Sequence, residues 1–238
     1  MNIFSVFLVI VVQQNSAIDS IKNLIEDNQN FTLIIELNDN YRKLEMFDSA
    51  NAYLKKYENQ YESEEQAQLN YLIAENLFFK GELLLAREQY LRTVAKFSNA
   101  RYANEALERL YLFESARKDT VLFKKLIRSI YHYEIRKLKM AEDSLRALVN
   151  TSIGGYALYY LALIHNDKKE FGHALSALEQ LNKDFPANRI HQAKILTAEI
   201  YYEIGKKKEA VKLLEELVVK YPNAPIGIKA RELLKHAR

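Results

Sequence analysis

Five histidines are the side chains of this 238-residue chain best suited to acid–base or metal chemistry: His132, His165, His173, His191 and His236. His165 and His173 are the pair that could meet, because they fall on the two helices of one expected hairpin. We expect neither a third histidine nor a carboxylate at the spacing from this pair that a metal site requires. The chain contains no cysteine, which excludes thiolate metal sites, disulfides and cysteine nucleophiles. We therefore predict no metal site.

Recognisable catalytic motifs are missing from the sequence. The six glycines, at positions 81, 154, 155, 172, 205 and 227, are too dispersed for a phosphate-binding loop. Adjacent glutamates such as Glu64–Glu65 and Glu215–Glu216 point to different sides of a helix, so they cannot act together as acid and base. We predict a protein that is not an enzyme, with no catalytic residues, no cofactor and no small-molecule substrate.

The elements that would position these side chains are helices joined by short turns. Only 6 glycines and 3 prolines punctuate a chain whose composition, 49% hydrophobic and 27% charged, is typical of a folded protein. In YYEIGKKKEAVKLLEELVVKYP, residues 201–222, two aromatic residues end one helix and Gly205 begins a turn. Ala210 opens a second helix, which Pro222 stops. Because alanine lets two helices approach closely, this pattern predicts a helical hairpin.

Similar hairpin patterns recur along the chain. Ala174 and Ala210 are 36 residues apart, and Ala50 and Ala86 have the same separation. The pattern resembles the tetratricopeptide repeat, a helix-turn-helix unit of about 34 residues. The resemblance covers nearly all of residues 31–238 and is strongest in the two C-terminal copies. It implies an all-α fold, a TPR-like helix-turn-helix solenoid.

One break in the spacing predicts two short arrays in tandem. Ala86 and the next candidate, Ala141, are 55 residues apart, so we expect an additional helix over residues 100–118. The stretch 96–110 reappears in altered form at 220–234, and residues 224–237 would be a capping helix. We therefore predict a signal peptide over 1–16, an N-terminal array with its following helix over 17–118, and a C-terminal array with its cap over 119–238.

The resemblance also implies where a partner binds, because the first helix of each hairpin lines the concave groove of such arrays. Large aromatic side chains at groove positions suit a protein or peptide partner, since tyrosine offers contact area and a polar tip. Alternatively, several of these side chains fill the space between helices, and we expect this of either Phe78 or Phe79. The groove residues carried over are Tyr71, Glu75, Phe78, Tyr156, Tyr159, Asn166, Glu199 and Tyr202.

A basic stretch is the alternative contact surface. Residues 117–139 hold eight basic and two acidic residues, and residues 118–238 carry a formal charge of +8 against −5 for residues 17–117. Basic charge with interleaved tyrosine suits nucleic acid or an acidic protein. A solvated helix face is the commoner outcome, so we do not expect nucleic acid. The candidate contact residues are Lys124, Lys125, Arg128 and Lys137.

The apolar run IFSVFLVIVV, residues 3–12, decides the expected location. It is too short for a membrane-spanning helix and fits the core of a secretory signal, although a buried first helix is the alternative. We expect no transmembrane span and, without cysteine, no lipid anchor. The 36-residue spacing is similar to that of bacterial envelope members of the family, which serve outer-membrane β-barrel assembly or the Tol–Pal system. We therefore predict an exported, periplasmic interaction scaffold; a cytoplasmic adaptor, similar to a co-chaperone, is the alternative.

Overall fold

The computed structural model describes residues 16, 18–26, 30–116 and 119–237. Within these residues every regular element is a helix, which confirms the predicted all-α, TPR-like solenoid class. The chain forms two compact units, residues 1–110 and 111–238. The predicted boundary at Lys118–Asp119 stays a prediction, and residue 118 lies outside the described ranges. So does the predicted signal peptide, apart from Ser16.

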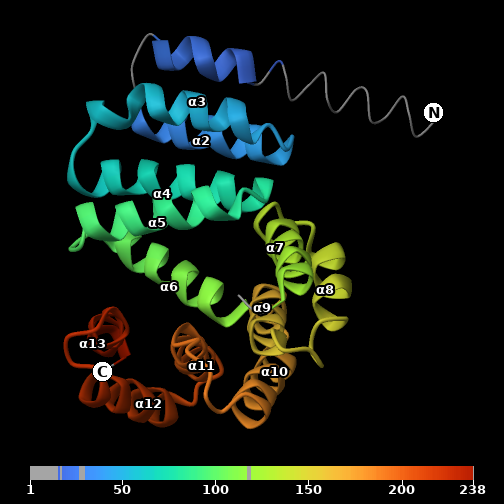
Figure 1. The fold of residues 1–238 in the computed structure, drawn as a ribbon. Coiled ribbons are helices and arrows are strands. Elements are labelled where there is room, and N and C mark those ends of the chain that lie inside the picture. Colours follow the sequence, from blue (N-terminus) through green and yellow to red (C-terminus); the bar gives the residue numbers. More distant parts are fainter. Residues whose placement is uncertain (1–15, 17, 27–29, 117–118, 238) are drawn as a thin grey trace. The chain divides into compact units, whose positions relative to one another are not determined.

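The described residues of the first unit include two helical hairpins. After a helical segment over 18–26 come α2 (Phe31–Lys43) with α3 (Phe47–Tyr57), a short 3-10 turn η1 (Glu58–Gln60), and α4 (Ser63–Lys80) with α5 (Leu83–Lys96). Figure 1 shows the two helices of each hairpin lying side by side. The helix α6 (Arg101–Ala116) follows, and its first ten residues belong to this unit. An additional helix was predicted at this place.

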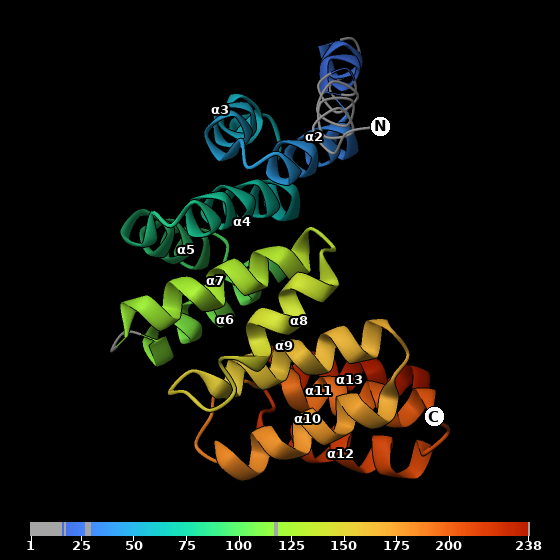
Figure 2. The same ribbon diagram turned by 90° about the vertical axis from the view of Figure 1, so that its right-hand side faces the viewer.

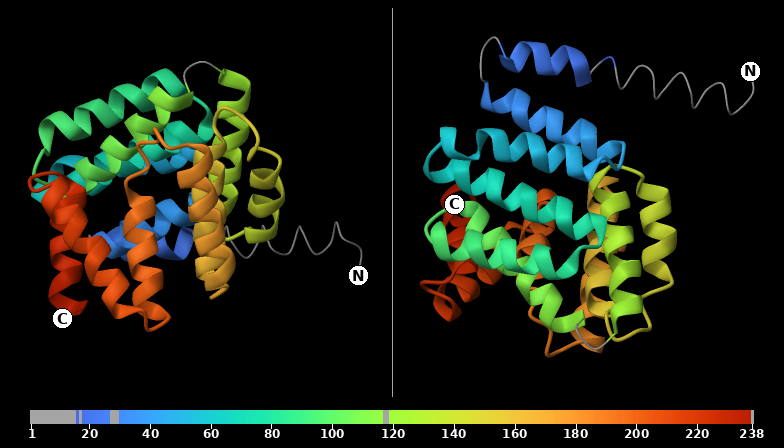
Figure 3. Two further views of the ribbon diagram at one scale, coloured as in Figure 1. Left: turned by 90° about the horizontal axis from the view of Figure 1, so that it is seen from below. Right: turned by 45° about the horizontal axis from the view of Figure 1, so that its top comes forward.

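The second unit contains three hairpins and a last helix. The hairpins are α7 (Thr120–Glu134) with α8 (Leu138–Arg146), α9 (Gly154–Asp167) with α10 (Phe171–Asp184), and α11 (Gln192–Glu203) with α12 (Lys207–Lys220). The last helix, α13 (Pro225–Ala237), packs on α12, as can be followed in Figures 2 and 3. Ile226 and Leu234 of α13 join the core around Leu214 and Leu217. That this helix caps a C-terminal array stays a prediction.

Small residues set the contacts between the helices of each hairpin. The alanines whose spacing predicted the repeat all have an exposed fraction of 0%, and each is the fourth residue of a second helix: Ala50, Ala86, Ala141, Ala174 and Ala210. Gly81 and Gly205 form the turns before α5 and α12 with φ of 89° and 80°, a conformation that glycine adopts without strain. The repeated hairpin is therefore a consequence of local sequence.

The two units contain corresponding helices at a constant spacing of 124 residues. This spacing separates Gly81 from Gly205, Leu83 at the start of α5 from Lys207 at the start of α12, and Arg101 from Pro225 at the starts of α6 and α13. The helices α5 and α12 have the same length of 14 residues. Residues 68–113 of α4–α6 therefore have counterparts at residues 192–237, which hold α11–α13.

Candidate protein-binding site

The predicted groove residues Glu75 and Phe78 lie inside the first unit. Glu75 of α4 is 2% exposed. Arg109 of α6 donates two hydrogen bonds to the Glu75 carboxylate, one from Nε and one from Nη2, and each has a length of 2.7 Å. The Tyr90 hydroxyl of α5 donates to the same carboxylate. Phe78 is 0% exposed, and its ring centroid lies 5.4 Å from the Arg109 guanidinium carbon. Glu75 and Phe78 are thus surrounded by the chain's own side chains, and Phe78 follows the alternative in which such residues fill the space between helices. A partner contact of these two residues stays a prediction.

The network around Glu75 stays charged. Burial acts to raise the pKa of Glu75, but the charge and hydrogen bonds of Arg109, with help from Arg42 and Tyr90, hold the pKa below its usual range. Burial, together with the negative charge of Glu75, raises the pKa of the Tyr90 hydroxyl well above its usual value, so this hydroxyl remains a donor. Three helices are thus joined by one buried, fully paired carboxylate.

Tyr71, another predicted groove residue, is half-buried beside this network. Its ring centroid lies 6.0 Å from that of Tyr90 and 5.6 Å from that of Tyr102. It therefore contributes to aromatic packing among α4, α5 and α6.

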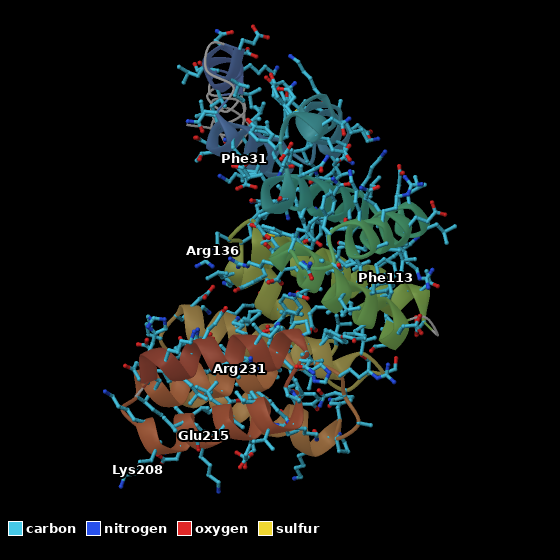
Figure 4. The ribbon with its side chains drawn as sticks, turned by 90° about the vertical axis from the view of Figure 1, so that its left-hand side faces the viewer. Phe31, Phe113, Arg136, Lys208, Glu215 and Arg231 are labelled. Atoms are coloured by element: carbon cyan, nitrogen blue, oxygen red, sulfur yellow. The ribbon has the colours of Figure 1, made fainter. Side chains whose placement is uncertain are left out.

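The second unit has an open cavity of about 170 Å³ where the first unit has this network. Helices α11, α12 and α13 supply its lining: Ala198, Glu199, Tyr202, Glu203, Leu214, Leu233 and His236. Glu199 is the counterpart of Glu75, and Tyr202 that of Phe78. Leu214 and Leu233 stand where the first unit has Tyr90 and Arg109. Figure 4 shows this end of the unit, with Arg231 on α13 and Lys208 and Glu215 on α12 as landmarks.

Glu199 and Tyr202 give the cavity its polar and aromatic character. Tyr202 is 38% exposed, and the Nζ atom of Lys207 lies 5.2 Å from its ring centroid. Burial raises the pKa of Glu199, while the positive charge of Lys229 acts in the opposite direction. A half-buried carboxylate beside an accessible aromatic ring is suited to hold a side chain of another molecule.

The three predicted groove residues of α9 lie outside this cavity's lining. Tyr156 is 9% exposed and contributes little surface. Tyr159 and Asn166 are half-buried, and the Tyr159 ring centroid lies 5.5 Å from that of Tyr160, which lies 5.7 Å from that of Tyr133. The structure thus brings Glu199 and Tyr202 together and places Tyr159 in a separate aromatic row.

The alternative basic surface is exposed in the structure. Lys124, Lys125 and Arg128 lie on α7 and Lys137 precedes α8, and all four side chains are accessible. Val121, one turn before Lys124 and Lys125, is 66% exposed. A contact with an acidic partner at this surface stays a prediction.

The histidine pair is accompanied by a carboxylate, contrary to the sequence analysis. Glu170 stands immediately before α10, and its Oε2 lies 2.6 Å from Nδ1 of His165 and 3.9 Å from Nδ1 of His173. The two imidazole centroids are 5.3 Å apart. The expectation overlooked Glu170 because it considered only helix faces. Lys169, in the left-handed conformation with φ of 60°, turns the chain so that Glu170 comes back to His165.

Comparison with known proteins identifies one repeat. Residues 192–224, which hold α11 and α12, match the family model described as Tetratricopeptide repeat. No curated protein matches the chain. The match and the all-helical hairpins are together consistent with an all-α, TPR-like solenoid. Repeats of this kind generally mediate protein–protein interactions and are typically non-catalytic modules.

The described helices were compared with the length and apolar character that a membrane-spanning helix needs. None of the helices found there is at once long enough and apolar enough to cross a bilayer.

Proposed function

We propose that this protein is a non-catalytic scaffold that binds a segment of a protein partner in the cavity between α11, α12 and α13. The observation that carries the proposal is the open space at Glu199 and Tyr202, at positions where the first unit is closed by its own side chains. The family match covers the two helices that supply most of this lining. Tyr202 is the anchor we assign, because accessible aromatic side chains at the centre of an interface often contribute 2 kcal/mol or more.

Affinity capture from the source cell tests this proposal. Tyr202→Ala is expected to weaken capture of the partner at least about tenfold, with little change in melting temperature. Tyr201→Ala is the matched control, because Tyr201 is the neighbouring tyrosine of α11 and does not line the cavity. Its capture is expected to equal that of the wild type. Capture that survives Tyr202→Ala would refute the cavity as the binding site.

The basic surface is tested in the same experiment. Charge reversal of Lys124, Lys125, Arg128 and Lys137 to Glu is expected to leave capture intact. Loss of capture in that variant, together with loss at raised salt for the wild type, would place the partner on α7 instead.

We also propose that the protein acts after export, in assembly or maintenance of the cell envelope. The support for this is the apolar run over residues 3–12 and the 36-residue spacing of the hairpins. N-terminal sequencing of the protein from its native cell tests the compartment. A chain beginning near residues 15–18 is the expected result, whereas an intact Met1 in a cytosolic extract would favour the cytoplasmic adaptor.

A further inference from the structure

The internal correspondence between the units indicates what the cavity of α11–α13 lacks. In the first unit, the space between α4, α5 and α6 is occupied by the Arg109 guanidinium, which is paired with Glu75 and lies over Phe78. In the second unit the carboxylate is retained as Glu199 and the aromatic ring as Tyr202. The arginine is replaced by Leu233, and the cavity remains open. The acid and the ring are therefore retained without an arginine that pairs with both. The cation beside the Tyr202 ring is Lys207, whose Nζ atom lies 5.2 Å from the ring centroid, and Lys229 acts on Glu199 only through its charge.

We propose that this cavity binds an arginine side chain from the partner segment. The inference rests on the proposed function. A guanidinium can donate two parallel hydrogen bonds to one carboxylate and can also lie over an aromatic face, which matches the pair Glu199 and Tyr202. Glu203 adds a second carboxylate to the lining, so the cavity favours a cation. Lysine would bind less well, because an ammonium group cannot form the two parallel hydrogen bonds.

A small probe tests the cavity without knowledge of the partner. The probe is N-acetyl-arginine methylamide, and the matched control is the citrulline analogue, which has nearly the same shape and no charge. Titration followed by nuclear magnetic resonance should give saturable shifts at Ala198, Glu199 and Tyr202 with the arginine probe. The shifts should be at least about tenfold weaker with the citrulline probe, because it cannot form the charge-assisted pair.

Substitution of Leu233 provides the decisive variant. Leu233→Arg recreates the first unit's arrangement, so the introduced side chain is expected to pair with Glu199 and to abolish the response to the arginine probe. Leu233→Met, a volume-conserving change, should retain that response. An equal response to both probes, or a response that persists in Leu233→Arg, would overturn the inference. Glu199→Gln should lose the response while remaining folded, with a melting temperature no lower than that of the wild type.

The inference and the proposed function can fail separately. If Glu199→Gln captures the cellular partner as well as the wild type and Tyr202→Ala does not, the arginine assignment is wrong and the scaffold function stands. If Tyr202→Ala captures the partner as well as the wild type does, both the proposed binding site and the arginine assignment are wrong.

A second observation, independent of the cavity, concerns the turn between α9 and α10. His165, Glu170 and His173 can each offer one ligand atom such that the three atoms lie within 4.8 Å of one another. His165 is buried, whereas the side chain of His173 is 76% exposed and can reorient. The same spacing of 124 residues relates α9–α10 to α2–α3, since it separates Ala50 from Ala174. The corresponding positions of α2–α3 are Tyr41, Met46 and Ser49, so the repeat itself does not require these side chains.

We infer that His165, Glu170 and His173 bind a zinc ion. Two imidazoles and one carboxylate are a ligand set that zinc accepts with a further position left for water. The nearby Lys168 donates a hydrogen bond of 2.6 Å to Glu142, and Arg146 donates to the same carboxylate. The side-chain partners of the Glu170 carboxylate are therefore the two histidines. Zinc–ligand distances of about 2.0–2.2 Å place ligand atoms roughly 3.3 Å apart. Glu170 must therefore move slightly away from His165, and His173 must move toward Glu170.

Calorimetric titration of the full chain with zinc chloride, after treatment with chelator, tests the site. One equivalent is expected to bind and to raise the melting temperature, because the ion joins α9 to α10. Glu170→Gln and His173→Ala should each lose this binding while remaining folded. His191→Ala, which removes a histidine that belongs neither to this cluster nor to the lining of the α11–α13 cavity, should keep it. Absence of binding by the wild type, or unchanged binding in His173→Ala, would overturn the inference.

Discussion

Residues 68–113 of α4–α6 correspond to residues 192–237 of α11–α13, yet the two sets use the space between their helices differently. In the first set, Arg109, Glu75 and Tyr90 close that space with a buried, charged network. In the second set, Leu233, Glu199 and Leu214 at the same positions leave a cavity. The comparison indicates that the hairpin repeat fixes where side chains stand. A few substitutions then decide whether a position stabilises the fold or remains available to a partner.

The largest expected effect is on the closed network. Arg109→Leu, which introduces the residue found at position 233, leaves the carboxylate of Glu75 buried without its main partner. Removal of one member of a buried ion pair typically costs about 3–5 kcal/mol in the free energy of unfolding. Urea denaturation followed by circular dichroism measures the loss.

Two further variants sharpen this result. Glu75→Leu combined with Arg109→Leu should recover much of the stability, because no unpaired charge remains buried. Lys80→Ala removes ion pairs to Asp48 and Glu82 at the surface and should cause no resolvable change. If Arg109→Leu costs no more than Lys80→Ala, the network does not stabilise the first unit as described.

The next effect tests what the two regions share. Ala86 and Ala210 are corresponding residues, both with an exposed fraction of 0%, where the two helices of a hairpin touch. Ala86→Leu and Ala210→Leu should each overpack the contact and cost about 1–3 kcal/mol. Thermal melts of both variants measure the effect, with Leu84→Ala as the control because Leu84 is 81% exposed. A melt that is unchanged in either alanine variant would contradict the correspondence of the hairpins.

The smallest expected effect is a difference in how Glu75 and Glu199 make the stability of the protein depend on pH. The pKa of Glu75 is lowered, so its contribution to stability is present above the unfolded-state value of about 4.3 and is lost as the pH falls below it. The pKa of Glu199 is raised. At a pH above this raised pKa, the ionised carboxylate slightly lowers the free energy of unfolding, and protonation removes this loss.

Glu199→Gln should therefore be slightly more stable than the wild type at pH 7, and this difference should disappear as the pH falls through the raised pKa toward 4. Denaturation curves of the two proteins at several pH values provide the measurement. A Glu199→Gln variant that is less stable than the wild type at pH 7 would show that Glu199 is paired inside the protein.

The sequence predicted the helices well because their determinants are local. The spacing from Ala174 to Ala210 and the turn at Gly205 act within one hairpin, so the pattern can be read without knowledge of the fold. The separate last helix, α13, was predicted for the same reason. A resemblance between neighbouring segments is enough to define this kind of architecture.

The candidate site was harder to predict because its character depends on a third helix. Glu75 and Glu199 stand at equivalent positions, and only the residue contributed by α6 or α13, Arg109 or Leu233, makes one closed and the other open. That residue lies 34 positions along the chain in each case, beyond the hairpin considered. Glu170 was missed because a single left-handed residue, Lys169, brings it to His165.

The most direct test of the account compares the accessibility of the corresponding residues Phe78 and Tyr202. Because the chain has no cysteine, Phe78→Cys and Tyr202→Cys each introduce a single thiol, and circular dichroism verifies that each variant is folded. The rate of thiol labelling under native conditions is then measured. We expect the thiol at position 202 to react nearly as fast as in the unfolded chain, and the thiol at position 78 to react only through unfolding. Similar rates at the two positions would contradict the claim that one space is closed and the other open.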